Sequence, residues 1–221
     1  MGGGVPSTGT PFFVAYPGII ITLLYIKTAT GGQDIHKSAI FGVHTRQQTK
    51  PTYMKVGLFI PCYINAVYPG VGRASYELLG RLGCEVDYPL GQTCCGQPMA
   101  NAGFEKDARA LAEHMDALFA QYDYVVGPSA SCVVFVREGY PRLLDNYREH
   151  ACVDSRIWEI CEFIHDVVRP AKLDARFPHR VSVHNSCHGV RKMGLSSPSE
   201  LNVPYMSKLR DLLSLVGDID I

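Results

Sequence analysis

The sequence lacks a surplus of charge of either sign. Its 21 lysine and arginine residues balance 21 aspartate and glutamate residues, so the formal net charge is zero. A protein that binds nucleic acid by contacting its phosphates needs a basic surface, and the composition supplies no basic surplus to build one. We therefore expect no nucleic-acid partner.

The sequence also lacks an apolar run of membrane-spanning length near its N-terminus. The stretch from Phe12 to Ile26 has 15 residues and is interrupted by Pro17-Gly18, whereas a spanning helix needs about 20. The opening residues, MGGGVPSTGT, carry none of the positive charge that begins a secretory signal. We expect a cytoplasmic protein with no stable membrane insertion; a short membrane anchor in this stretch is the alternative.

Two families of cofactor motif are missing as well. Neither G-x-G-x-x-G nor a P-loop stands at an expected strand–helix junction, so there is no dinucleotide fingerprint. Paired cysteines of the C-x₂₋₄-C type, which are usual in structural zinc sites, are also absent.

Cysteines are present, eight in all. Their density is well below that of a small disulfide-stapled secreted domain. In a reducing compartment disulfides are disfavoured, and clustered cysteines indicate metal or redox chemistry instead.

The first 53 residues differ from the remainder of the chain. They are rich in glycine, threonine and proline and show neither a helical nor a strand period. At Met54 a clear pattern begins, because MKVGLFIPC contains a short apolar run typical of a buried strand. We expect Met54 to be the natural start and residues 1–53 to be a poorly ordered extension upstream of it.

From Met54 onward, strand and helix patterns alternate. This alternation predicts an α/β fold, a parallel sheet flanked by helices on both faces. The expected strands lie at 54–60, 84–88, 122–127 and 180–184, and the expected helices at 71–82, 104–121, 131–149, 155–168 and 204–216.

Five cysteines follow expected strands. Cys62 follows the first strand, Cys94 and Cys95 lie in the loop after the second, Cys132 follows the third, and Cys187 follows the strand that ends at 184. In an open parallel sheet the functional loops lie at the carboxyl ends of the strands. We therefore expect all four loops to meet at one edge of one sheet.

Four of these cysteines suit one cluster. Gly96, directly after the adjacent pair, permits the sharp turn that two neighbouring ligands require. Thiolates of Cys62, Cys94, Cys95 and Cys132 would match the four ligands of a [4Fe–4S] cluster. A structural zinc site is the rival interpretation. Cys84 and Cys161 lie within strand or helix patterns and are interpreted as small core residues.

Cys187 indicates a second site. It lies in HNSCHGVRK, between His184 and His188 and ahead of Arg191, and no further cysteine follows before the last residue. The histidines and Arg191 are candidates for binding a carboxylate or for tuning a sulfur site through hydrogen bonds, and solvated loop residues are the alternative. The second site is therefore expected to be incomplete in this chain.

The segments KVGLFIPCY, QTCCGQPMANAGF, YDYVVGPSASC and RVSVHNSC resemble the cysteine-rich CCG-domain proteins, a family of iron–sulfur subunits. Its members serve lactate utilization, glycolate oxidation and heterodisulfide reduction, and the resemblance is strongest to the lactate-utilization members. It runs from about Met54 to the C-terminus. It implies a first CCG domain at 54–178 and the truncated start of a second at 179–221.

The resemblance also implies a role. The chain would be an iron–sulfur electron-transfer subunit in a system that oxidises L-lactate to pyruvate, working with other iron–sulfur and accessory subunits. An iron–sulfur subunit of a glycolate or glycerol-3-phosphate oxidising complex and a structural Cys₄ module are the alternatives. Heterodisulfide reductases have C-x-x-C where this chain has Ser129-Ala130-Ser131-Cys132, so the resemblance implies four ligands here rather than five.

Overall fold

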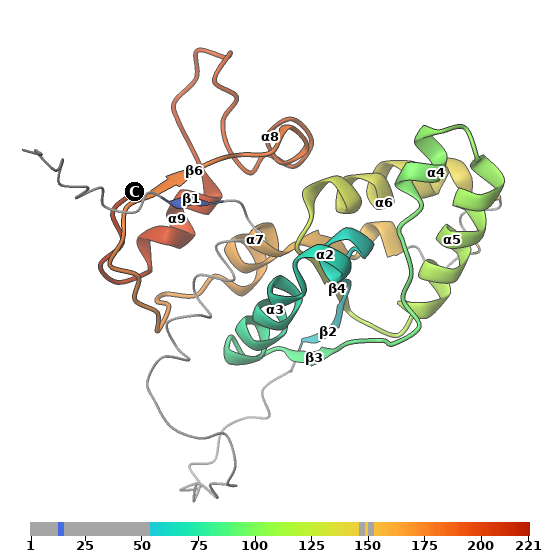
Figure 1. Cartoon of the computed structure of the whole chain (residues 1–221), viewed down its shortest axis with the longest axis horizontal. Helices are drawn as coiled ribbons and strands as arrows, with labels where there is room; N and C mark the ends of the chain where they lie inside the picture. The colour runs from blue at the N-terminus through green and yellow to red at the C-terminus, as the bar shows by residue number, and fades with distance from the viewer. Residues whose placement is uncertain (1–12, 16–53, 146–148, 150–152) are drawn as a thin grey trace, which may run out of the picture.

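The computed structural model describes residues 13–15, 54–145, 149 and 153–221. Its centre is a four-stranded sheet in which every neighbouring pair of strands is parallel (Figure 1). The order across the sheet is β3-β2-β4-β5. These strands are β2 (Lys55–Leu58), β3 (Glu85–Asp87), β4 (Tyr124–Gly127) and β5 (Ile157–Glu159). The predicted α/β class, with a parallel sheet between helices, is confirmed.

Helices connect the strands and cover the sheet. The longer ones agree with the sequence pattern to within a few residues at most of their ends, whereas three short helices that begin at or follow cysteines, α2, α4 and α8, were not predicted. The helices are α2 (Cys62–Val67), α3 (Pro69–Arg81), α4 (Gln97–Asn101), α5 (Glu105–Leu118), α6 (Ala130–Leu143), α7 (Ile160–Phe163), α8 (Cys187–Met193) and α9 (Lys208–Ser214), with a 3₁₀ turn η2 (Val153–Ser155) and a π-helical turn η3 (Ile164–Val168).

The sheet separates two apolar cores. Because side chains alternate along a strand, Leu58 and Val126 face one core with α3, α7 and α9, while Phe59 and Val125 face the other with α5 and α6. All four side chains are at most 1% exposed. Burial on both faces is usual for a parallel sheet and explains the continuous apolar runs in its strands.

The segment 155–168 was predicted as one helix, and this is wrong at its start. Residues 157–159 form the edge strand β5, which pairs with β4, and only then do α7 and η3 begin. The apolar residues of IWEICEFIHDVV satisfy a helical period throughout. A strand of three residues is too short to produce a contrary signal.

The strand expected at 180–184 is present, but it belongs to a different sheet from the one predicted. β6 (Val181–Val183) pairs in parallel with β1 (Phe13–Ala15) in a separate two-stranded sheet. The expectation that the Cys187 loop shares the edge of the main sheet is therefore wrong. Apart from 13–15, the predicted extension 1–53 lies outside the described residues.

Within the described ranges, no helix is both long enough and apolar enough to cross a membrane.

The C-terminal helix α9 packs with the rest of the chain: it contributes Leu209, Leu212 and Leu213 to the same core as β2 and α3. The boundary predicted at 178/179 stays a prediction.

Candidate functional site

The predicted cluster ligands come from three loops at the carboxyl edge of the main sheet. Cys62 begins α2, shortly after β2, and Cys132 lies in the first turn of α6, after β4. Cys94 and Cys95 lie between β3 and α4. Strands β3, β2 and β4 are consecutive neighbours, so the sheet order itself brings these loops together.

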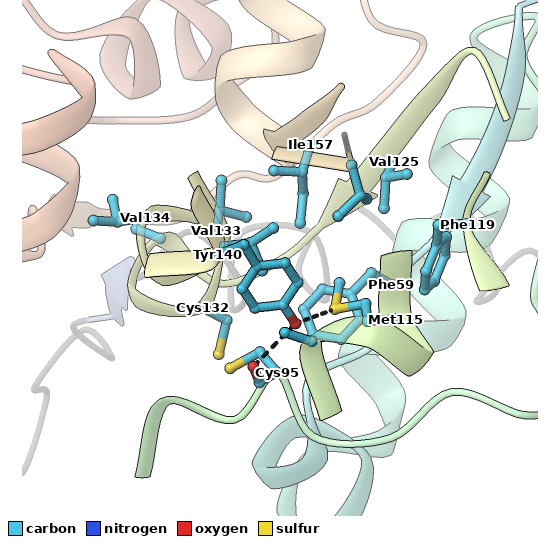
Figure 2. Close-up of a cluster of buried hydrophobic side chains, with 14 of the residues drawn as sticks. Phe59, Cys95, Met115, Phe119, Val125, Cys132, Val133, Val134, Tyr140 and Ile157 are labelled. Carbon is cyan, nitrogen blue, oxygen red and sulfur yellow. Dashed lines mark hydrogen bonds between the residues drawn. The ribbon is translucent and has the colours of Figure 1, made fainter. Parts of the chain in front are cut away.

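The four sulfurs form two pairs. The Sγ atoms of Cys62 and Cys94 lie 3.6 Å apart. Cys95 and Cys132 are joined by a side-chain hydrogen bond, and Figure 2 shows their sulfurs directed toward each other. The pairs also interact electrostatically, Cys132 with Cys62 and Cys94 with Cys95. Within the described residues, no group of three or more Cys, His, Asp or Glu side chains stands in an arrangement that could hold a metal ion.

One pair is buried and the other is open to solvent. Cys95 and Cys132 are 2% and 6% exposed, whereas Cys62 is exposed and Cys94 is half-buried. The hydrogen bond to Cys95, together with those to Ser129 and Ser131, lowers the pKa of Cys132 to about 7. The same bond, followed by burial, raises the pKa of Cys95. Burial and then the contact with Cys94 raise the pKa of Cys62.

The Cys94-Cys95 turn is held in place by contacts from distant parts of the chain. The Tyr140 hydroxyl, fully buried in α6, donates a hydrogen bond to the Cys95 carbonyl over 3.0 Å and also lies 3.0 Å from the Met115 sulfur (Figure 2). Gln92 stabilises the start of the loop: its Oε1 accepts from the Ile60 amide, and its Nε2 donates to the Leu58 carbonyl. The cysteine turn is therefore fixed both to β2 and to the core.

Gly96 has a backbone conformation that other residues adopt only with strain. Its φ is 91°, in the left-handed region, and a Cβ there would lie 3.2 Å from the Ala108 carbonyl oxygen. Gly103 has a similar φ of 84°, but a Cβ there would meet nothing within 4 Å. Comparing substitutions at these two glycines therefore distinguishes the effect of backbone strain from the effect of steric contact.

We expect Gly96→Ala to lower the free energy of unfolding by more than Gly103→Ala does. Both substitutions place a side chain on a left-handed backbone, which costs about 1–2 kcal/mol. Only the Cβ at position 96 would also press against Ala108 and so shift α5 or the cysteine turn. Urea denaturation followed by circular dichroism measures both. Equal losses in the two variants would show that the contact with Ala108 does not restrain the turn.

Cys187 makes no hydrogen bond with any of the four cysteines within the described part of the chain. It is an exposed residue and begins α8. α8 packs against α6, where Lys192 forms a 3.1 Å ion pair with Glu138. Its predicted role in a second site stays a prediction.

The basic residues after Cys187 form ion pairs on the surface. Arg191 pairs with Glu200 at 3.3 Å, and both side chains are well exposed. His188 is exposed as well.

Cys84 and Cys161 are buried, which confirms their interpretation as core residues. Cys152 lies outside the described residues.

Sequence reasoning missed a polar group where α6 meets β5 and α7. Arg137 of α6 donates to the Ile157 carbonyl and to both carboxylate oxygens of Glu162, and its guanidinium lies 5.4 Å from the centre of the Trp158 ring. Next to it, Glu159 is completely buried. The signal was available in the sequence, because two carboxylates stand in the otherwise apolar run IWEICEFI.

Comparison with known proteins agrees with this arrangement. Residues 56–137 match the model of the CCG cysteine-rich domain. This part of the chain is a CCG cysteine-rich domain. The matched residues contain β3, β4, β2 from its second residue, and all four cysteines of the site. No solved structure matches the chain.

The CCG domain has curated relatives that share a name. The chain is 42% identical over 146 residues to lactate utilization protein A of Geobacillus sp. (strain WCH70), covering 64% of this chain and 61% of the relative. It is 40% identical over 153 residues to the protein of that name from Exiguobacterium sp. (strain ATCC BAA-1283 / AT1b), covering 66% and 62%. A third, from Bacillus velezensis, is 40% identical over 147 residues, covering 65% and 61%. The matched region thus spans about three fifths of these relatives.

Proposed function

We propose that Cys62, Cys94, Cys95 and Cys132 hold a [4Fe–4S] cluster and that the CCG domain uses it to pass electrons in the oxidation of L-lactate. The observation that carries this proposal is the convergence of four cysteines, as two sulfur pairs, at the carboxyl edge of one sheet. The donor set suits the cluster, because each iron takes one thiolate. When bound, the cluster accepts and releases one electron at a time.

The surrounding residues have separable tasks. Tyr140 and Gly96 fix the Cys95 turn, so the ligand is positioned before any metal arrives. Ser129 and Ser131 donate hydrogen bonds to the Cys132 sulfur, which stabilises negative charge there. Burial of Cys95 and Cys132 excludes water from one side of the site.

The other side is open for a redox partner. Cys62 is exposed, and the apolar side chains Tyr63, Val67 and Tyr68 on and after α2 are also exposed. Exposed apolar patches frequently mark interfaces. Another subunit of a lactate-oxidising system is the partner that we propose for this surface.

The relatives' names support the choice of lactate. Oxidation of L-lactate to pyruvate releases two electrons and two protons, so a carrier that accepts one electron at a time must turn over twice. We propose that this chain supplies that relay and that a different subunit binds the substrate. The alternatives, glycolate and glycerol 3-phosphate, require the same relay and differ only in the upstream partner.

Growth of the native host tests this function. Deleting the gene should abolish growth on L-lactate while leaving growth on pyruvate intact, and the wild-type gene should restore it. Normal growth of the deletion strain on L-lactate, with failure on glycolate or on glycerol 3-phosphate, would contradict the assignment and name the correct substrate.

A structural Cys₄ zinc site is tested by redox cycling of the purified chain. After anaerobic reconstitution we expect a brown protein that dithionite bleaches and an oxidant restores, with unchanged circular dichroism. A colourless protein with one zinc per chain, which unfolds when the zinc is chelated, would contradict electron transfer.

A further inference from the structure

Glu159 lies at the same sheet edge as the cysteine site. It is the last residue of β5, in register with Gly127, the last residue of β4. The chain leaves β4 through Pro128 and Ser129 and reaches Cys132 in the first turn of α6. The carboxyl group is therefore on the strand next to the one that delivers a ligand, and its side chain is 0% exposed.

The two oxygens of this carboxyl group have different surroundings. Oε2 caps α7, accepting from the Cys161 amide at 2.7 Å and from the Glu162 amide at 3.2 Å. Oε1 is buried and has no hydrogen-bond partner among the described residues. An unpaired buried carboxylate oxygen is costly, and a proton on the group removes most of that cost.

The groups facing Glu159 from its neighbouring elements do not neutralise it. Glu162 of α7 adds negative charge, and Arg137 of α6 opposes it, but that guanidinium is already bound to Glu162 and to the Ile157 carbonyl. Burial is the largest effect and raises the pKa of Glu159 to about 7. The Cys161 thiol is buried, and burial raises its pKa well above the ordinary range, so it stays neutral.

One partly exposed side chain, Tyr63, lies within electrostatic range of this carboxyl group. Tyr63 of α2 interacts electrostatically with Glu159 and hydrogen bonds to Ser129. Its side chain is 46% exposed and follows Cys62 directly. Tyr63 is thus close to the buried carboxyl group and also reaches solvent beside the exposed Cys62.

We propose that Glu159 is a redox-linked proton site, which takes one proton from solvent when the cysteine-ligated centre gains one electron and returns it on oxidation. The inference rests on the proposed cluster. A one-electron reductant supplies the electron and a hydronium ion of the solvent supplies the proton, so the products are the reduced centre, a neutral carboxylic acid and water. Added negative charge at a nearby site increases the proton affinity of a buried carboxylate, since the protein interior screens charge weakly.

Potentiometric titration of the reconstituted full chain between pH 6 and pH 10 tests the proposal. Above about pH 7 the midpoint potential should fall with pH, at most by about 59 mV per unit, which is a tenfold change in the equilibrium constant. In Glu159→Gln this slope should vanish. In Glu85→Gln, an exposed position on β3 with the same change of charge, it should persist.

The measured slopes and the iron content distinguish failure of the proton coupling from failure of the cluster. A flat wild-type potential, or a slope that survives in Glu159→Gln, overturns the coupling while leaving the cluster intact. A chain that binds no iron overturns the proposed function and the coupling with it. If the glutamine variant fails to fold, the redox-induced infrared difference spectrum of the wild type decides instead: a protonated carboxyl band must appear on reduction, and its absence overturns the proposal.

Discussion

Cys95→Ser should remove most of the iron from the reconstituted chain while leaving the fold intact. Cys95 lies in the buried pair with Cys132, is the most buried of the four cysteines, and accepts a hydrogen bond from Tyr140 at its carbonyl. Serine is nearly isosteric, but its hydroxyl is a poor ligand for iron at neutral pH, because it keeps its proton. Loss of a ligand should exceed the 10- to 100-fold losses in metal affinity that follow removal of outer-shell partners.

A matched control is available in Cys84→Ser. Cys84 is also buried, 7% exposed, but it lies in the core beneath α3 and is not paired with any of the four cysteines within the described residues. Iron content and visible absorption should match wild type in this variant. If both variants lose iron equally, the loss reports general destabilisation, and if Cys95→Ser keeps its iron, Cys95 is not a ligand.

The Arg137–Glu162 ion pair should contribute strongly to the stability of the fold. Arg137→Met should lower the free energy of unfolding by about 3–5 kcal/mol, the usual cost of removing one partner from a buried ion pair. The Glu162 side chain is only 8% exposed, so its carboxylate would be left without its cation. The Ile157 carbonyl would lose two donors at the junction between β5 and α6. Urea unfolding followed by circular dichroism gives the value.

Two further variants identify the cause of this loss. Adding Glu162→Gln to Arg137→Met should recover part of the stability, because the uncompensated charge is gone. Arg191→Met breaks the exposed pair with Glu200 and should cost no more than about 1 kcal/mol. A loss below 1 kcal/mol in Arg137→Met would show that the pair contributes no more than a surface contact.

Much of the site could be predicted from the sequence because strand ends determine where its cysteines lie. Cys62, Cys94, Cys95 and Cys132 each follow a strand, and the parallel order of three neighbouring strands brings them to one edge. Cys187 also follows a strand, but a strand pattern does not specify its partner. β6 pairs with β1, so the same reasoning failed at that position.

The contacts that support the site could not be predicted because they join distant parts of the chain. Tyr140 and the Cys95 carbonyl are 45 positions apart, and Arg137 and Glu162 are 25 apart. Such pairs depend on how α6 lies over the sheet, which periodicity does not specify. Glu159 was overlooked for a related reason: its segment was interpreted as helix, and a helical position would not place it at the end of a strand in register with Gly127.

We propose that four cysteines of one CCG domain hold one [4Fe–4S] cluster. Iron and acid-labile sulfide measured per chain, together with Mössbauer spectroscopy of the anaerobically reconstituted protein, test it directly. We expect about four irons and four sulfides per chain in one tetrahedral-sulfur environment, lost in Cys95→Ser and kept in Cys84→Ser. One zinc per chain with no sulfide, or iron that stays bound without Cys95, would contradict it.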